Sequence, residues 1–176
     1  MNITESQLQK LKRIKLLLLD VDGVMTDGSI IYDGDGDEIK AFNARDGVGT
    51  RLLMKAGISI GIVTGRSSKA LHHRCKNLGI ALIFDGVRDK AAVLPAVLEQ
   101  TRVSPEQIAF AGDDIVDISL MKLVGLSVAV SDAHKTVTER ADIVTAAPGG
   151  KGAVREICEA ILKAQGLWEK VTENFM

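Results

Sequence analysis

The stretch Ile14-Lys15-Leu16-Leu17-Leu18-Leu19-Asp20-Val21-Asp22-Gly23 decides the fold class. Its four consecutive leucines predict a short strand that is buried on both faces, because a strand with one solvated face would alternate apolar and polar residues. The apolar run stops at acidic residues and a glycine, which indicates that the strand ends in a turn. A strand buried on both faces is typical of a parallel sheet between two layers of helices.

Similar apolar runs recur along the chain and alternate with segments of helical spacing. After the first strand at 14–19, further strands are predicted at 58–63, 81–84, 108–111, 126–130 and 143–145. Helices are predicted at 48–55, 67–78, 90–100, 115–124, 135–141 and 152–165. This alternation predicts an α/β, Rossmann-like fold, with a parallel sheet and helices on both of its faces.

One segment breaks this alternation directly after the first strand. Residues 29–32 and 38–42 flank Asp33-Gly34-Asp35-Gly36-Asp37, a pattern typical of a β-hairpin with a glycine-rich turn. The acidic turn matches the first three ligand positions of an EF-hand loop. However, Glu38 stands where that loop needs Gly, and Ala44 stands where it needs Glu. We therefore interpret the insertion, about residues 28–42, as a small hairpin with a solvated tip and not as a calcium site or a cap domain.

The composition excludes several classes of partner. The 176 residues carry 22 basic and 23 acidic side chains and only six aromatic ones, so they offer neither the field nor the stacking surface that nucleic acid needs. No apolar run approaches the roughly 20 residues of a membrane span. The first residues lack the apolar run of a signal peptide, and two cysteines without ligand spacing suit a reducing compartment. We expect one cytoplasmic domain over residues 1–176, with a polar tail from about 166 and no nucleic-acid or membrane partner.

Polar side chains follow the predicted strands at the points where the strands end. Asp20 and Asp22 follow the first strand, Thr64 the second and Asp113 the fourth, while Lys90 opens the helix after the third. Because the carboxyl ends of parallel strands meet at one edge of a sheet, these groups are expected to converge. Close carboxylates repel unless a cation lies between them, and oxygen donors favour Mg²⁺ over zinc. The sequence therefore predicts an Mg²⁺ site at this edge.

In this order the motifs resemble those of the haloacid dehalogenase superfamily of phosphatases. Longer strings resemble the family of 3-deoxy-D-manno-octulosonate 8-phosphate phosphatases, over about residues 14–166. These strings are Asn43-Ala44-Arg45-Asp46-Gly47, Ile62-Val63-Thr64-Gly65-Arg66-Ser67, Gly86-Val87-Arg88-Asp89-Lys90, Val130-Ser131-Asp132-Ala133-His134 and Gly149-Gly150-Lys151-Gly152-Ala153-Val154-Arg155-Glu156. The resemblance implies Mg²⁺-dependent hydrolysis of this sugar-acid phosphate to the free sugar acid and inorganic phosphate, a step that serves lipopolysaccharide biosynthesis.

The resemblance also implies a role for each residue of the predicted site. Asp20 would be the nucleophile that forms an aspartyl-phosphate, and Asp22 would protonate the leaving oxygen and later activate water. Thr64 would donate to the phosphate, and Lys90 would offset its charge. The metal would bind the Asp20 carboxylate, the backbone carbonyl of Asp22, and Asp113. Asp114 and Asp117 would orient water or Lys90.

A sugar acid carries a carboxylate of its own, so its pocket needs cations away from the phosphate. Arginine suits a carboxylate because its planar fork binds both oxygens. The resemblance implies a substrate site formed by Asp22, Asn43, Ala44, Arg45, Asp46, Gly47, Arg51, Arg66, Arg74 and Lys90. Val116 stands where many family members have Asn, so one polar contact that would support tight substrate selectivity is missing.

Other functions fit part of the pattern. A phosphatase for a nine-carbon ulosonate phosphate, or for sugar phosphates in general, is the nearest alternative, although similar nine-carbon enzymes tend to have an acidic residue in place of Arg66. A receiver-like signalling module also uses Asp, Thr, Lys and Mg²⁺, but its phosphorylated Asp follows the third strand, whereas Asp20 follows the first. A catalytically silent subunit of a larger assembly is a third possibility.

The core contains no cap that could cover the predicted site. The resemblance implies a homotetramer in which the hairpins associate and a neighbour's C-terminal tail closes the site. The hairpin itself favours association, because it has more apolar side chains than an isolated two-stranded hairpin should expose. These side chains are Ile30, Ile31, Tyr32, Ile39 and Phe42.

Overall fold

A six-stranded, all-parallel sheet forms the centre of the computed structural model, which describes residues 3–173. Its strands are β1 (Leu16–Leu19), β4 (Ser59–Val63), β5 (Leu82–Phe84), β6 (Ile108–Gly112), β7 (Leu126–Ala129) and β8 (Ile143–Val144). Their order across the sheet is β5-β4-β1-β6-β7-β8, so β1 lies between β4 and β6. The predicted α/β fold with a parallel sheet is confirmed.

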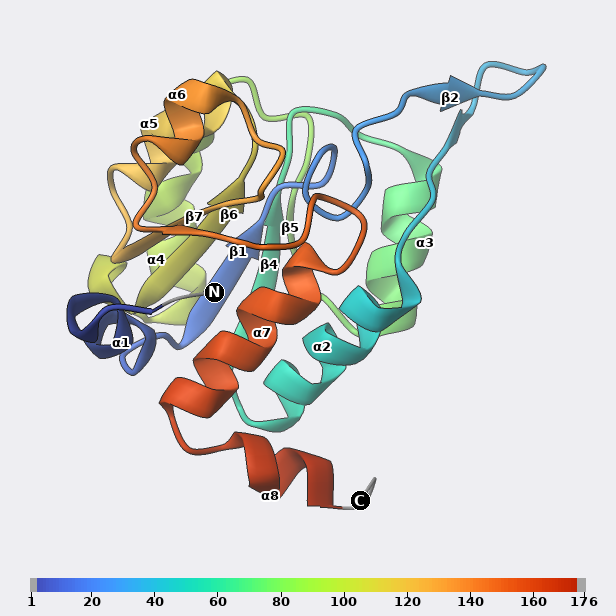
Figure 1. Cartoon of the computed structure of the whole chain (residues 1–176). Coiled ribbons are helices and arrows are strands. Elements are labelled where there is room, and N and C mark those ends of the chain that lie inside the picture. The colour runs from blue at the N-terminus through green and yellow to red at the C-terminus, as the bar shows by residue number, and fades with distance from the viewer. Residues whose placement is uncertain (1–2, 174–176) are drawn as a thin grey trace.

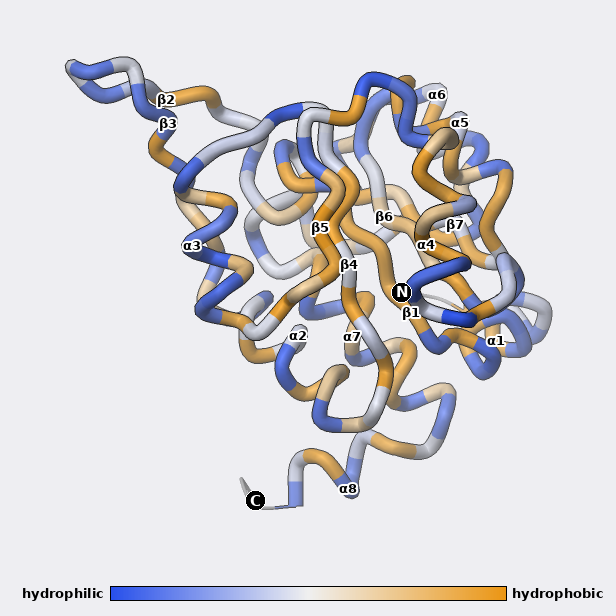
Figure 2. Tube along the Cα trace, turned by 180° about the vertical axis from the view of Figure 1, so that it is seen from behind, coloured by the Kyte–Doolittle hydropathy of each residue, from blue (hydrophilic) through white to orange (hydrophobic). Residues whose placement is uncertain are grey.

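Helices cover both faces of this sheet (Figure 1). One layer contains α1 (Glu5–Leu11), α2 (Ala44–Lys55), α3 (Lys69–Leu78) and α7 (Ala153–Ala164), whose buried side chains share one hydrophobic cluster. The other layer contains α4 (Leu94–Thr101), α5 (Ile118–Met121) and α6 (Lys135–Thr138), which share a second cluster. Seen from behind, the apolar strands run between these two layers (Figure 2).

The four leucines of β1 explain why the first strand is central. Leu17 and Leu19 belong to the cluster under α2 and α7, whereas Leu16 and Leu18 belong to the cluster under α4 and α5. All four side chains are completely buried. Successive side chains of a strand point to opposite faces, so an uninterrupted apolar run supplies both cores at once.

The helix that follows the hairpin begins four residues earlier than its periodicity predicts. The side chain of Asn43 caps α2 by accepting a hydrogen bond from the N–H of Arg45, at 2.8 Å. Gly47 and Gly49 lie inside this helix, and their low helix propensity hides its first turn in the sequence pattern. Residues 44–47 are therefore helical and not part of a loop.

Two other predicted helices begin as short 3₁₀ segments. Residues Lys90–Val93 form the 3₁₀ helix η1 ahead of α4, because Pro95 has no N–H to give to the carbonyl of Ala91. That carbonyl accepts instead from the N–H of Leu94. Similarly, Ile115–Asp117 forms η3 ahead of α5, and a third 3₁₀ turn, η2, spans Pro105–Gln107.

The chain ends differ most from expectation. Helix α1 was not predicted, although Thr4 and Gln7 form a capping box that marks its start. The polar tail expected from residue 166 contains α8 (Trp168–Thr172), which packs against α2 and α7 and buries Val171. The last residues of that expected tail, 174–176, lie outside the described residues. No helix within residues 3–173 has the length and apolar character needed to cross a bilayer.

The predicted hairpin insertion is confirmed. Strands β2 (Ile31–Tyr32) and β3 (Glu38–Ile39) pair in antiparallel fashion and project away from the main sheet (Figure 1). Ile31, Tyr32 and Ile39 are each about half exposed.

Candidate active site

The carboxyl ends of β1, β4 and β6 open into a cleft of about 470 Å³. The cleft brings together predicted site residues from separate segments of the chain: Asp20, Asp22, Thr64, Arg66, Lys90 and Asp113. Gly28, Gly65, Val87, Arg88, Asp114 and Val116 complete its lining. The convergence of polar groups at this edge of the sheet is therefore as predicted.

A tight turn after β1 separates the directions of Asp20 and Asp22. The carbonyl of Val21 accepts hydrogen bonds from the N–H groups of residues 24, 25 and 26, so the chain folds back immediately. Gly23 has a φ of +86°, and a Cβ at this position would lie 2.1 Å from Oδ2 of Asp113. Glycine is thus required both for the turn and for the close approach of Asp113.

Lys90 lies between two buried carboxylates. Its Nζ is 2.9 Å from Oδ1 of Asp20, and it also forms an ion pair with Asp117. Asp117 is completely buried, and its other oxygen accepts the backbone N–H groups of Asp113 and Asp114, at 2.9 and 3.1 Å. Asp117 therefore holds both Lys90 and the loop that carries Asp113, which fits the orienting role expected for it.

The carboxylates of this cluster outnumber its cations. Asp20, Asp113 and Asp117 can each place an oxygen within 4.8 Å of the others, and Lys90 is the ammonium among them. Burial, opposed in part by Lys90, raises the pKa of Asp20 to about 6. Burial and the charge of Asp20 raise the pKa of Asp113 to about 8. Burial alone would lower the pKa of Lys90, but Asp20 and Asp117 raise it.

This cluster fits a hard divalent cation. The raised pKa of Asp113 means that the described residues do not compensate its negative charge, and a cation beside Asp20 and Asp113 would do so. All the donors are oxygens, as Mg²⁺ prefers. Asp117 is already used by Lys90 and two N–H groups. The carboxylate of Asp22 is outside the cluster, so a metal contact from Asp22 would have to come from its backbone carbonyl.

Thr64 and Arg66 line the cleft where β4 ends. Thr64 is 2% exposed, and its N–H donates to the carbonyl of Phe84 at 2.9 Å. This hydrogen bond fixes the backbone that carries the Thr64 hydroxyl. Arg66 lies at the mouth of the cleft and reaches the hairpin. Its Nε donates to Glu38 at 2.9 Å, and its Nη2 donates to the Tyr32 hydroxyl at 2.9 Å.

Seven of the predicted substrate-binding residues lie outside this cleft: Asn43, Ala44, Arg45, Asp46, Gly47, Arg51 and Arg74. Asp46 is buried and accepts the N–H of Arg155 at 2.7 Å, which joins α2 to α7. Arg74 donates to the carbonyl of Asn43 at 3.1 Å and lies over the ring of Phe42. These contacts tie α2 to its neighbours, and they follow from the early start of that helix.

The remaining predicted residues on α2 do not line the cleft either. Arg51 donates from Nη2 to the carbonyl of Asn77 at 2.8 Å, and Ala44 and Arg45 are exposed. Sequence reasoning also missed cleft residues. Arg88 lines the cleft, and Lys40 reaches Asp22 from the hairpin. Arg88 follows β5, so the rule that site residues lie after the carboxyl ends of parallel strands could have indicated it. Lys40 lies in the hairpin insertion, to which this rule does not apply.

Comparison with known proteins agrees with this geometry. Residues 82–157 match the model of the haloacid dehalogenase-like hydrolases. The 3-deoxy-D-manno-octulosonate 8-phosphate phosphatase KdsC of Escherichia coli (strain K12) is 45% identical over 164 residues, which are 93% of this chain and 87% of that protein. The chain belongs to the family of 3-deoxy-D-manno-octulosonate 8-phosphate phosphatases.

Solved structures of this phosphatase family share the fold closely. The crystal structure of the Yersinia pestis phosphatase has a TM-score of 0.93 and 45% identity, and the match covers 95% of this chain and 90% of that one. The Moraxella catarrhalis phosphatase was solved in complex with a magnesium ion, a phosphate ion and a KDO molecule. It has a TM-score of 0.93 and 39% identity over 96% of this chain and 97% of that chain.

Proposed function

We propose that this chain hydrolyses 3-deoxy-D-manno-octulosonate 8-phosphate to the free sugar acid and inorganic phosphate, with Mg²⁺ as its cofactor. The observation that carries the proposal is the cleft itself. A buried Asp20 paired with Lys90 lies beside Asp113 and Thr64, in a chain that is 45% identical to phosphatases of this specificity. The corresponding step would supply this sugar for lipopolysaccharide biosynthesis, and two buried free thiols suit the reducing cytoplasm.

The first half-reaction transfers the phosphoryl group to the protein. A carboxylate oxygen of Asp20 attacks phosphorus and forms an O–P bond, while the bond from phosphorus to the sugar's O8 breaks on the opposite side. Asp22 gives its proton to O8 as the alcohol leaves. Lys90 and the Thr64 hydroxyl donate to the phosphoryl oxygens, where negative charge must be stabilised in the transition state.

The second half-reaction restores the carboxylate of Asp20. Asp22, now ionised, accepts a proton from water, the water oxygen bonds to phosphorus, and the bond to Asp20 breaks. Inorganic phosphate then leaves the cleft. Mg²⁺ bound by Asp20, the Asp22 carbonyl and Asp113 would neutralise phosphate charge and so lower the repulsion that the nucleophile meets.

Arg66 is the proposed contact for the sugar acid's own carboxylate. Its guanidinium lies at the cleft mouth, and its side chain is 42% exposed although it already holds Glu38 and Tyr32. The seven predicted substrate residues outside the cleft remain proposed substrate contacts. Three of them, Asn43, Asp46 and Arg74, already make contacts around the start of α2.

The proposed activity is tested by phosphate release from a panel of phosphate esters. We expect turnover of 3-deoxy-D-manno-octulosonate 8-phosphate with Mg²⁺ and its loss when EDTA replaces the metal. Hexose phosphates lack the carboxylate of the sugar acid. Their kcat/KM should be at least about 10-fold lower than that of the eight-carbon ester, because losing one modest ionic contact costs about 1.4 kcal/mol. A nine-carbon ulosonate 9-phosphate distinguishes the nearest alternative. Equal turnover of hexose phosphates and the eight-carbon ester would contradict the specific assignment.

We further propose that the chain acts as a homotetramer in which hairpins associate and a neighbour's C-terminal segment closes the cleft. The support comes from the hairpin, where Ile30, Ile31, Tyr32 and Ile39 are each between 43% and 56% exposed. So many exposed apolar side chains on a two-stranded hairpin are unfavourable in a monomer.

Replacing Ile31 with Asp should dissociate the assembly. Burying a carboxylate at an apolar contact is costly, so the mass measured by light scattering should fall from that of a tetramer towards that of one chain. Leu123→Asp is the matched control, because Leu123 is also exposed, at 45%, but lies outside the hairpin, after α5. A wild-type protein that is monomeric at micromolar concentration would contradict the proposal.

A further inference from the structure

Lys40 of the hairpin contacts Asp22, one of the residues that line the cleft. It follows β3, and its side chain is only 3% exposed. Its Nζ forms an ion pair with Oδ1 of Asp22 and lies 3.1 Å from Oε2 of Glu38. A lysine is almost never this buried unless its charge is paired. The hairpin therefore contributes a desolvated cation directly to Asp22, the proposed proton donor.

The two oxygens of Asp22 have different surroundings. Oδ1 is held by Lys40. Oδ2 is buried and has no hydrogen-bond partner among residues 3–173, and Nε of Arg66 lies 4.0 Å from it. A buried carboxylate oxygen without a donor is unfavourable and calls for a partner. The ion pair with Lys40 is therefore the contact that holds the carboxyl group of Asp22 in place in the cleft that Asp22 lines.

We propose that Lys40 is a positioning residue for Asp22: by holding Oδ1 it fixes the orientation of the carboxyl group that exchanges a proton with the leaving group and then with water. The inference rests on the proposed phosphatase function. No bond is formed or broken at Lys40 itself.

The second contact of Lys40 explains why the hairpin can hold this geometry. Glu38 contacts Lys40 on one side and Arg66 on the other, and Nη2 of Arg66 also donates a hydrogen bond to the Tyr32 hydroxyl. The side chains of Lys40 and Glu38 are 3% and 11% exposed, so their ion pair is largely withdrawn from solvent, whereas the Arg66 side chain is 42% exposed. Glu38 and Lys40 of the hairpin thus connect Arg66 to Asp22 through successive ion pairs.

The test compares Lys40→Met and Lys40→Arg with the wild-type protein. Removing a group that orients a catalytic residue costs about 10- to 100-fold in activity. We expect Lys40→Met to lower kcat by that factor and to change KM by less than about threefold, because Lys40 touches Asp22 and not substrate. Lys40→Arg keeps the charge and should remain within about fivefold of wild type.

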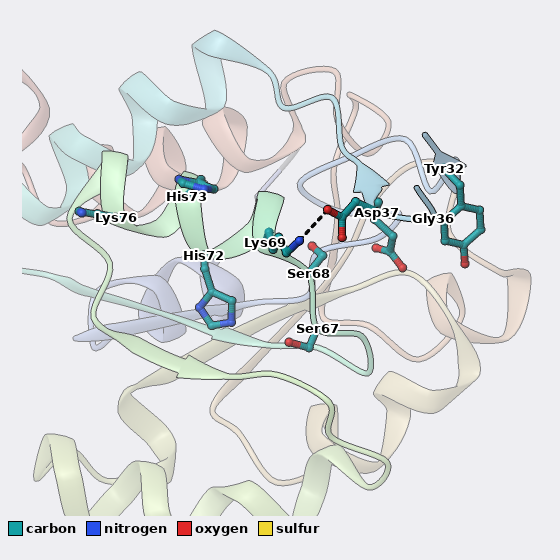
Figure 3. A pocket seen from close by; sticks show the side chains of 10 residues that line it. Tyr32, Gly36, Asp37, Ser67, Ser68, Lys69, His72, His73 and Lys76 are labelled. Atoms are coloured by element: carbon teal, nitrogen blue, oxygen red, sulfur yellow. Dashed lines mark hydrogen bonds and ion pairs between the residues drawn. The ribbon is translucent and has the colours of Figure 1, made fainter. Parts of the chain in front are cut away.

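A double-mutant cycle separates this role from a general structural one. In an Asp22→Asn background, assayed at high enzyme concentration, Lys40→Met should change kcat by less than about twofold, since its target has been removed. The matched control is Lys69→Met. Lys69 also binds the hairpin, through Asp37 at 2.6 Å, but it lies in a separate hollow of about 610 Å³ between the hairpin and α3 (Figure 3). That variant should stay within about twofold of wild type.

Several results would overturn the inference. They are a Lys40→Met kcat within twofold of wild type, a rise in KM with kcat unchanged, or a full-sized loss that persists in the Asp22→Asn background. If Lys40→Met does not fold, as judged by circular dichroism, Lys40→Gln takes its place with the same expected loss. A wild-type protein that releases no phosphate from any ester of the panel would instead contradict the proposed function.

Discussion

Asp20→Asn is expected to lose at least about 10³-fold of the Mg²⁺-dependent phosphatase activity, because the amide cannot form the aspartyl-phosphate. Asp20 is buried at the end of β1 and contacts Lys90 at 2.9 Å, so no neighbouring carboxylate can move into its place without breaking that packing. The measurement is phosphate release at saturating substrate, and acid-quenched protein should retain no label from a ³²P-labelled substrate. Activity within 10-fold of wild type would contradict the role of Asp20.

Asp85→Asn is the matched control for this substitution. Asp85 also follows a parallel strand at the same edge of the sheet, but it pairs with His72 and does not line the cleft. Its variant should keep wild-type kcat. If both variants lose activity equally, the loss reflects damage to the sheet edge and not removal of a nucleophile.

The pH dependence of stability tests the charge state of Asp20 independently of activity. Its pKa is about 6 in the folded protein against an ordinary value of 3.8, so the folded state binds this proton more tightly than the unfolded state. In EDTA, wild-type stability should therefore fall as the pH rises from about 4 to 8, and the raised pKa of Asp113 adds to that fall. Asp20→Asn removes one of these charges, so its melting temperature should decline less over the same range.

The strand-and-helix alternation was enough to predict the sheet, since period and burial are local properties of the sequence. Where the predicted start of a helix was wrong, one or two residues had overridden the pattern. Pro95 turned the start of a predicted helix into η1, and two glycines hid the first turn of α2. The sequence of α8 is mostly polar and predicts a tail, whereas its packing against α2 and α7 buries Val171.

The site was predictable as far as the strand-end rule extends. Asp20, Thr64, Lys90 and Asp113 converge because parallel strands end together. The residues of α2 were predicted from the resemblance alone, and the structure places Arg51 against α3 and Asp46 against α7. Lys40 was missed because it belongs to the hairpin, and the ion pair between Lys40 and Asp22 cannot be deduced from the spacing of residues along the hairpin.

Lys90→Met should lower both stability and activity. Lys90 is the cation between Asp20 and the completely buried Asp117. Removing one partner of a buried ion pair leaves an uncompensated charge and costs about 3–5 kcal/mol. The same ammonium is proposed to stabilise charge on the transferring phosphoryl group, and the loss of one such donor lowers kcat by about 10²–10³-fold. Thermal denaturation and phosphate release measure the two effects separately.

The double variant Lys90→Met/Asp117→Asn tells a structural lysine from a catalytic one. Asn at 117 removes the buried charge, while its side-chain oxygen can still accept N–H groups from residues 113 and 114. Much of the lost melting temperature should therefore return. Activity should not return, because no cation then faces the phosphate from this side of the cleft. Recovery of kcat together with stability would mean that Lys90 only holds Asp117 in place and that the phosphoryl charge is met by Mg²⁺, Thr64 and backbone donors alone.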